Sequence, residues 1–280
     1  MIHPPFDGVE TWIFDLDNTL YPPHERLFSQ IEARISAYVQ RELGVDEDEA
    51  HRLRRAYWHD HGTTLAGLML NHGIDPEPFL EEVHDIDFSR LDPDPLLRKA
   101  IDRLPGRKIV YTNGARRYAG RALSALGLGG AFERTWSIED AFYEPKPRAS
   151  AFQRIFGKDG LDPRHAAFFE DDPRNLAVPA ALGVIGVLVR PGAAPKRTAA
   201  EAPEPAGGPL PAPPETAAAL AEEVAQAARR APIRPPAEEV PDHVAFVARD
   251  LPRFLADLTD PAAPAPTRFG QEGLLEDQAS

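Results

Sequence analysis

Two aspartates separated by one residue stand directly after a short apolar stretch near the start of the chain. Residues 11–14 read Thr-Trp-Ile-Phe, and Asp15 and Asp17 follow. Such a run predicts a buried strand, and side chains two positions apart on an extended strand share one face. Two crowded carboxylates repel each other unless a cation neutralises them. In an all-oxygen site that cation is Mg²⁺, held by carboxylates, water and a substrate phosphate.

Polar residues of the kinds that phosphoryl transfer uses also follow two later apolar stretches. These stretches span residues 108–111 and 166–169, and the residues after them are Thr112, Asn113, Gly114, Glu170 and Asp171. Lys146 lies between the two groups, in a loop bracketed by prolines. A phosphoryl-transfer site needs a nucleophile, a proton donor, a metal ion and donors for the phosphoryl oxygens. The chain holds a candidate for each.

The expected chemistry divides between the two aspartates. Asp15 attacks phosphorus and forms an aspartyl-phosphate. Asp17 protonates the leaving oxygen and later activates the water that hydrolyses this intermediate. The Thr112 hydroxyl and the amides of Asn113 and Gly114 are expected to cradle the phosphoryl oxygens at a helix N-terminus.

The remaining charged residues are expected to balance charge and hold the ion. Lys146 offsets the charge of the nucleophile and the phosphate together. Mg²⁺ is expected to be held by Asp15, by the backbone carbonyl of Asp17 and by Asp171, with Glu170 reaching it through water.

Each motif also has a plainer structural reading. Asp15 and Asp17 could form an Asx-turn. Thr112 and Asn113 could cap a helix, and a single lysine such as Lys146 is usually solvated. The occurrence of all the pieces in order along one chain favours the catalytic reading.

Composition narrows the class of protein. The 280 residues carry a formal net charge of −13, which argues against a nucleic acid polymer as the main partner. The chain has no cysteine, no apolar run of the length a membrane span needs and no secretory signal at its start. The sequence therefore predicts a cytoplasmic protein with no disulfide, no thiolate chemistry and no membrane partner.

Strand and helix patterns alternate along most of the chain, which predicts a Rossmann-like, doubly wound and mainly parallel α/β sheet. Between the first strand and the rest, residues 22–91 show only helical periodicity and are expected to form an inserted all-helical cap. In that cap, His84 either lines the face toward the site or packs as an ordinary histidine.

The expected domains follow from these patterns. The α/β core comprises residues 1–21, 92–191 and 241–259, and the helical cap comprises 22–91. Prolines, together with Ala, Glu and Gly, crowd residues 192–240, so this insertion is expected to be disordered or a semi-rigid spacer. The tail at 260–280 is also expected to be disordered.

The motif residues resemble those of hydrolases in the haloacid dehalogenase (HAD) superfamily. The resemblance covers residues 9–190, and the cap position resembles the superfamily's helical insertion of the first type. Within the superfamily the chain looks most like the pyrimidine 5′-nucleotidase branch. The stretches that carry this likeness are residues 14–22 (Phe-Asp-Leu-Asp-Asn-Thr-Leu-Tyr-Pro), 65–68, 72–76, 83–87 and 92–95. The branch often ends with a strand and helix like those expected at 244–258.

Two departures from the branch's pattern bear on the site. The last motif reads Glu-Asp-Asp where the branch more often has Asp-Asp-Ser, so Asp172 is expected to add a charge near the metal. Gly114 replaces a small side chain and is expected to loosen the phosphate loop.

The resemblance implies a Mg²⁺-dependent phosphomonoesterase that acts on a small phosphorylated metabolite, specifically a pyrimidine nucleoside 5′-monophosphate. A phosphatase or mutase of small sugar phosphates is the enzymatic alternative. A non-catalytic scaffold, working through the Pro-rich segment, is the alternative outside enzymes. The sequence does not specify an oligomeric state.

Overall fold

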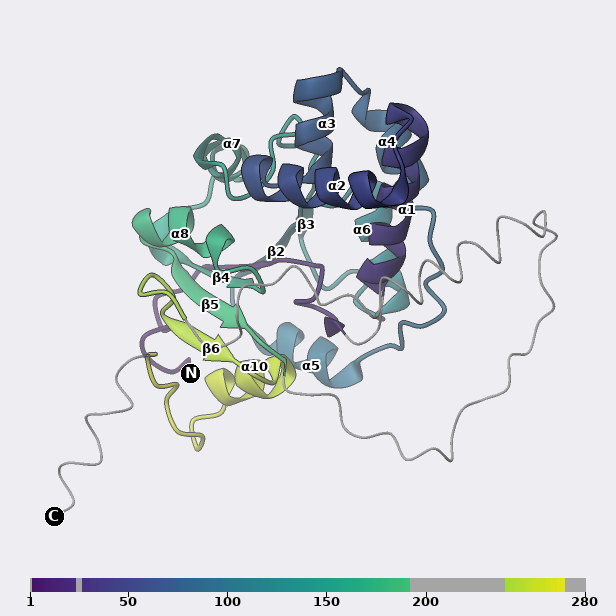
Figure 1. Ribbon diagram of the computed structural model, residues 1–280. Helices are drawn as coiled ribbons and strands as arrows, with labels where there is room; N and C mark the ends of the chain where they lie inside the picture. Colours follow the sequence, from purple (N-terminus) through teal and green to yellow (C-terminus); the bar gives the residue numbers. More distant parts are fainter. Residues whose placement is uncertain (1, 24–26, 192–239, 270–280) are drawn as a thin grey trace, which may run out of the picture.

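Six parallel strands form one sheet in the computed structural model, which describes residues 2–23, 27–191 and 240–269 (Figure 1). The strands are β1 (Thr11–Phe14), β2 (Arg107–Tyr111), β3 (Arg134–Trp136), β4 (Ala166–Glu170), β5 (Ile185–Val189) and β6 (Phe246–Ala248). Their order across the sheet is β3-β2-β1-β4-β5-β6, so the direction of winding reverses between β1 and β4. In such sheets the carboxyl ends of the strands form a crevice at this reversal. The predicted fold class is confirmed.

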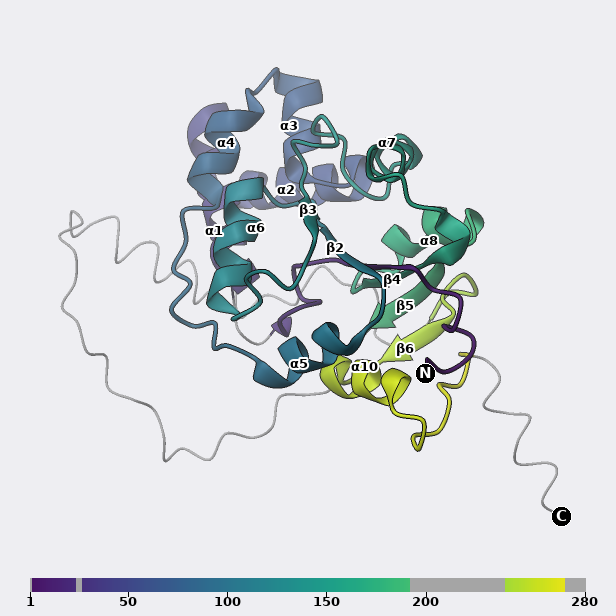
Figure 2. The ribbon, with the colours of Figure 1, turned by 180° about the vertical axis from the view of Figure 1, so that it is seen from behind.

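Helices cover both faces of the sheet (Figures 1 and 2). They are α5 (Pro95–Arg103), α6 (Arg116–Ala125), α7 (Ala149–Asp159), α8 (Arg174–Ala181) and α10 (Leu251–Thr259). Trp12 and Phe14 of β1 pack in one core cluster with residues of α5, α6 and α10. Ile13 packs in the other cluster, with residues of α7 and α8. Successive strand residues thus face opposite helical layers, because side chains alternate along a strand.

Four helices fill the segment between β1 and α5, and the described part of that segment contains no strand. They are α1 (Leu27–Leu43), α2 (Glu47–His61), α3 (Thr64–His72) and α4 (Pro76–Val83). Side chains that accept from backbone amides begin three of them: Asp46 caps α2, Thr63 caps α3 and Asp75 caps α4. Gly73, with φ of 64°, ends α3 in the left-handed conformation that glycine tolerates.

The chain crosses between the helical insertion and the sheet twice. Tyr21 stands at the start of the outgoing crossing, and residues 84–94 form the returning one. The His84 ring stacks on the Tyr118 ring of α6, with centroids 4.5 Å apart and planes inclined by 22°. Phe88 lies against the same ring at 5.8 Å. The returning crossing is therefore packed directly on α6.

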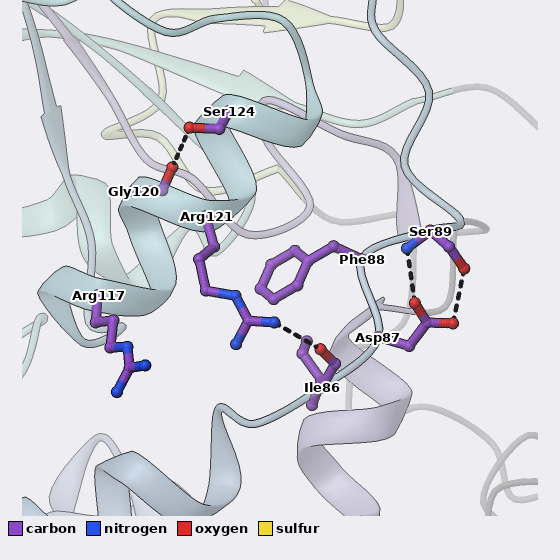
Figure 3. A pocket seen from close by; sticks show the side chains of 8 residues that line it. All are labelled: Ile86, Asp87, Phe88, Ser89, Arg117, Gly120, Arg121 and Ser124. Carbon is purple, nitrogen blue, oxygen red and sulfur yellow. Dashed lines mark hydrogen bonds between the residues drawn. The ribbon is translucent and has the colours of Figure 1, made fainter. Parts of the chain in front are cut away.

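A surface cavity of about 600 Å³ opens where the returning crossing meets α6 (Figure 3). Inside it, Arg121 donates to the carbonyl of Ile86 at 3.3 Å and its guanidinium lies 4.4 Å from the Phe88 ring centre. None of the predicted catalytic residues lines this cavity.

The Pro-rich insertion predicted at 192–240 lies almost wholly outside the described residues, as does most of the predicted tail. The strand and helix expected beyond it are present as β6 and α10. The described part of the tail ends at Phe269, whose N–H donates to the carbonyl of Ala245 at 3.0 Å. Among the helices that the structure describes, none combines the length and apolar character needed to cross a bilayer.

The packing of His84 on Tyr118 makes the stability of the fold depend on pH. Burial lowers the pKa of His84 to about 4, although its hydrogen bond to the Leu80 carbonyl opposes the shift. His84 therefore becomes protonated below about pH 6.5 in the unfolded chain, but only below about pH 4 in the folded protein. Stability is lost as pH falls through this window, by up to about 3 kcal/mol.

Replacing His84→Gln should flatten this acid-side loss, measured as the urea-unfolding free energy at pH 7, 6, 5 and 4.5. His59→Gln is the matched control, since that imidazole is 80% exposed on α2. Equal slopes in the wild type and His84→Gln would contradict the assignment.

Candidate active site

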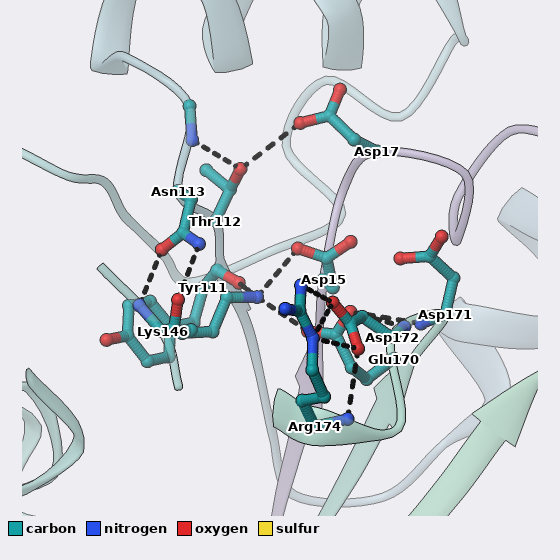
Figure 4. Close-up of polar contacts among 11 residues, drawn as sticks. Asp15, Asp17, Tyr111, Thr112, Asn113, Lys146, Glu170, Asp171, Asp172 and Arg174 are labelled. Carbon is teal, nitrogen blue, oxygen red and sulfur yellow. Dashed lines mark hydrogen bonds and ion pairs between the residues drawn. The ribbon is translucent and has the colours of Figure 1, made fainter. Parts of the chain in front are cut away.

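The site is built at the carboxyl ends of three adjacent strands, β2, β1 and β4 (Figure 4). Phe14 is level with Val110 of β2 and with Phe169 of β4, so the residues that follow these strands meet at one edge. The Asp15 N–H donates to the Phe169 carbonyl at 2.9 Å, which extends the strand pairing by one residue.

The first strand ends where the sequence pattern predicts, and a turn follows it. β1 ends at Phe14, and residues 17–20 form a turn in which Asn18 takes a φ of 61°. Asparagine is one of the few non-glycine residues that tolerate this conformation. Asp15 and Asp17 lie in one site, Asp15 directly after the strand and Asp17 at the start of the turn.

Lys146 is the centre of the site. Its Nζ donates to Asp15 Oδ1 at 2.7 Å, to Glu170 Oε2 at 2.7 Å and to the Tyr111 carbonyl at 2.9 Å (Figure 4). The Lys146 and Glu170 side chains are each only 1% exposed, and that of Asp15 is 7% exposed. The ammonium group thus uses all three protons on acceptors from three different strand ends.

Carboxylates outnumber the ammonium group around Lys146. Asp15, Glu170 and Asp171 each offer an oxygen within 4.8 Å of the others. Glu170 also accepts the backbone N–H of Asp171 at 3.1 Å, so it is held at both oxygens. Three carboxylates beside one lysine leave a negative excess, and an all-oxygen cluster of this kind fits Mg²⁺.

The pKa values of Asp15 and Lys146 reflect this excess of negative charge. Burial and then the charge of Glu170 raise the pKa of Asp15 to about 8, while Lys146 opposes the rise. Burial alone would lower the pKa of Lys146, but the adjacent Asp15 and Glu170 raise it above its usual range. The lysine is therefore always charged, and a further cation would favour ionised Asp15.

Asp17 is held by two tyrosines that the motif analysis did not identify as site residues. The hydroxyls of Tyr21 and Tyr118 both donate to Asp17 Oδ1 at 2.5 Å. Burial raises the pKa of Asp17, and these hydrogen bonds oppose the rise. Thr112 Oγ1 lies 3.5 Å from the other oxygen, Oδ2.

The loop after β2 is tied to itself and to the Lys146 loop. Thr112 Oγ1 accepts the N–H of Gly114 at 2.9 Å, so that amide is used within the loop. The Asn113 side chain accepts the Lys146 N–H at 2.8 Å and donates to the Lys146 carbonyl at 3.1 Å. Asn113 thereby fixes the segment that carries the lysine. A Cβ on Gly114 would lie 2.9 Å from Tyr118 Cδ1, so glycine here makes room for a ring.

Asp172 does not add an uncompensated charge near the carboxylates, contrary to the sequence-based expectation. Its two oxygens accept from Arg174, at 2.7 Å from Nη2 and 3.1 Å from Nε (Figure 4). The Arg174 guanidinium in turn lies 3.6 Å from the centre of the Trp58 ring on α2. This chain of contacts joins the end of β4 to the helical insertion.

Comparison with known proteins gives relatives of low overall identity. The chain is similar to the structure of L-2-haloacid dehalogenase from Xanthobacter autotrophicus, with 17% identity, coverage of 88% of this chain and 98% of that one, and a TM-score of 0.47. It is also similar to a HAD phosphatase from Thermococcus onnurineus, with 21% identity, coverage of 66% and 88%, and a TM-score of 0.44.

Two comparisons rest on sequence. Phosphate metabolism protein 8 of Saccharomyces cerevisiae is 27% identical over an alignment of 197 residues that covers 64% of this chain and 61% of that relative. The chain thus spans less than two thirds of the relative's length. The profile of haloacid dehalogenase-like hydrolases matches residues 9–183, which include every residue of the site described above. The chain belongs to the haloacid dehalogenase-like hydrolase family.

Proposed function

We propose that this chain is a Mg²⁺-dependent phosphomonoesterase that works through an aspartyl-phosphate on Asp15. The observation that carries the proposal is the position of Lys146 Nζ, 2.7 Å from both Asp15 and Glu170, with Asp171 in the same cluster. A nucleophile held by a fixed ammonium group, beside carboxylates suited to a divalent ion, supports attack on a phosphate monoester.

The two aspartates divide the chemistry. An Asp15 oxygen forms a bond to phosphorus as the bond to the ester oxygen breaks, and Asp17 gives that oxygen its proton. Asp17 then takes a proton from the water that attacks the aspartyl-phosphate, which releases inorganic phosphate and restores Asp15. The raised pKa of Asp17 supports its part as proton donor.

The loop after β2 and Lys146 receive the phosphoryl group. Thr112 Oγ1 accepts from Gly114 and donates only a long hydrogen bond, 3.5 Å, to Asp17 Oδ2, which a phosphoryl oxygen would replace as acceptor. The backbone of Asn113 and Gly114 lies beside this hydroxyl, before the N-terminus of α6. Lys146 offsets charge on the nucleophile and the phosphate together.

Carboxylates on two strand ends would hold the ion. Asp15 and Asp171 would bind it directly, with the Asp17 carbonyl, and Glu170 would reach it through water. When bound, Mg²⁺ would offset the negative charge of the phosphate and the carboxylates. The helical insertion would act as the cap over this site.

Asp17 also favours phosphate ester hydrolysis over dehalogenation within the family. A halide leaves without a proton, so a dehalogenase has no use for an acid at this position. Here Asp17 is fixed by two tyrosine hydroxyls. Such an arrangement is consistent with a leaving group that needs a proton.

The finer proposal is a pyrimidine nucleoside 5′-monophosphate as substrate. It is supported by the likeness of residues 14–22 and of the insertion to the pyrimidine 5′-nucleotidase branch. The name of the yeast relative, phosphate metabolism protein 8, is compatible with it.

A substrate panel tests this proposal. With Mg²⁺, we expect release of inorganic phosphate from UMP or dUMP at a kcat/KM at least about tenfold above that for purine nucleotides and small sugar phosphates. A preference for a sugar phosphate would support the phosphatase proposal and overturn the proposal of a nucleotide substrate. No turnover of any monophosphate, with partner binding that requires residues 192–240, would favour the scaffold instead.

Asp15→Asn should lower turnover by roughly 10³-fold or more, because the amide cannot attack phosphorus. The fold should persist, since Lys146 keeps Glu170 and the Tyr111 carbonyl as acceptors. Acid quenching with ³²P-labelled substrate should label the wild-type protein and not the variant. Asp102→Asn, on the exposed side of α5, is the matched control. Undiminished turnover in Asp15→Asn would rule the mechanism out.

Neighbouring aspartates give a paired test of the metal site. Asp171→Asn should weaken Mg²⁺ binding about tenfold or more in isothermal titration calorimetry. Asp172→Asn should change it little, because that carboxylate is bound to Arg174. Chelation of the ion should stop phosphate release. Equal effects of the two substitutions would argue against Asp171 as a ligand.

A further inference from the structure

The carboxylate of Asp17 is held asymmetrically. Its Oδ1 accepts from both Tyr21 and Tyr118 at 2.5 Å, and the two hydroxyl oxygens lie 3.1 Å from each other. The rings of these tyrosines are buried, with 2% and 1% exposure. Within the described part of the chain, the hydrogen bond of Oδ2 is a long one, at 3.5 Å, from Thr112 Oγ1. One oxygen is thus fixed by two donors, and the other faces the loop that is proposed to bind the phosphoryl group.

The bound oxygen sets the direction of the free one. A carboxylate is planar, so fixing Oδ1 from two directions restricts rotation of the whole group. A proton donor must lie within hydrogen-bond reach of the atom that it protonates. Without the two hydroxyls, Asp17 could rotate away from the ester oxygen while remaining in the site.

Packing around Tyr118 shows how its hydroxyl is brought to Asp17. A Cβ at Gly114 would lie 2.9 Å from Tyr118 Cδ1, so the ring occupies space that only glycine leaves open. His84 and Phe88 of the returning crossing pack against the same ring, at 4.5 and 5.8 Å.

Tyr21 reaches Asp17 from the outgoing crossing. The two donors therefore stand at the two places where the helical insertion joins the core. The side chains that pack at the junctions with the insertion are therefore the same ones that orient Asp17.

We propose that Tyr21 and Tyr118 are positioning residues for Asp17, which aim its free oxygen at the ester oxygen of the substrate. The inference rests on the proposed function, since it needs a leaving group to protonate. In that step the phosphorus–oxygen ester bond breaks as Asp15 bonds to phosphorus, and the proton moves from Asp17 to the departing oxygen. The tyrosines exchange no proton in the step.

A misplaced proton donor affects alkyl and aryl phosphate monoesters differently, whereas a distorted site affects both. An alkoxide such as the 5′-oxygen of a nucleoside is a poor leaving group and needs the proton. A nitrophenolate leaves readily without it. Loss of a positioning hydroxyl should therefore slow alkyl monoesters selectively, whereas a distorted site slows alkyl and aryl monoesters alike.

The experiment compares kcat/KM for UMP and for p-nitrophenyl phosphate, in Mg²⁺, across a set of variants. This ratio reports the step in which the ester bond breaks, even if hydrolysis of the aspartyl-phosphate limits kcat. Tyr118→Phe, Tyr21→Phe and the double variant each lose only hydroxyls. Asp17→Asn gives the kcat/KM values expected when the proton donor is lost completely.

We expect each single variant to lower kcat/KM for UMP by about 10-fold, and the double variant by about 10²-fold, approaching Asp17→Asn. The value for p-nitrophenyl phosphate should change less than about threefold. Tyr38→Phe is the matched control, because Tyr38 is a buried tyrosine that packs on Phe79 within the insertion. It should alter neither value.

Each other outcome overturns the inference in a distinguishable way. Equal losses on both substrates would assign the tyrosines a structural role only, and thermal unfolding of each variant would show it. Unchanged values on both substrates would show that Asp17 needs no such support. Absence of turnover by the wild type on UMP, on p-nitrophenyl phosphate and on the other monophosphates of the substrate panel would defeat the proposed function itself.

Discussion

The buried contact of Lys146 with two carboxylates is the interaction on which the rest of the site depends. An ammonium group withdrawn from water is very costly unless charged partners surround it. Here those partners come from the ends of different strands, so they meet only if the strands are in register. The pairing of Phe14 with Val110 and Phe169 supplies that register. The sheet and the ion pair thus require each other, and an error in either would leave a buried charge without a partner.

Much of the fold could be predicted because its signals are local. Short apolar runs between helical patterns identify strands, and the parallel order follows from their alternation. The polar residues that end these runs, such as Asp15 and Glu170, were predictable for the same reason. Lys146 was identified only by its place between two motifs, since an isolated lysine carries no sign of burial. The structure brings all three together.

Other parts of the site depend on contacts that no local pattern contains. Tyr118 reaches Asp17 across 101 residues of chain, and it lies on a helix whose pattern indicates only a buried face. The local clue is Gly114, four residues earlier, because a missing side chain predicts a looser loop but does not identify what fills the space. In the structure the Tyr118 ring lies where a side chain at Gly114 would stand. The sequence likewise does not reveal that Arg174 neutralises the charge of Asp172, because that ion pair depends on the direction of both side chains.

The reciprocal bonds between Asn113 and the Lys146 backbone have a consequence for the chemical ageing of the protein. Asparagine followed by glycine is the pair most prone to spontaneous deamidation, in which the glycine nitrogen attacks the side-chain amide. Here that nitrogen donates to Thr112 Oγ1, and the amide is held at both ends by the lysine loop. The contacts that shape the site therefore also keep the two reactants from meeting. The folded state slows the decay of a sequence that would degrade quickly in an open peptide.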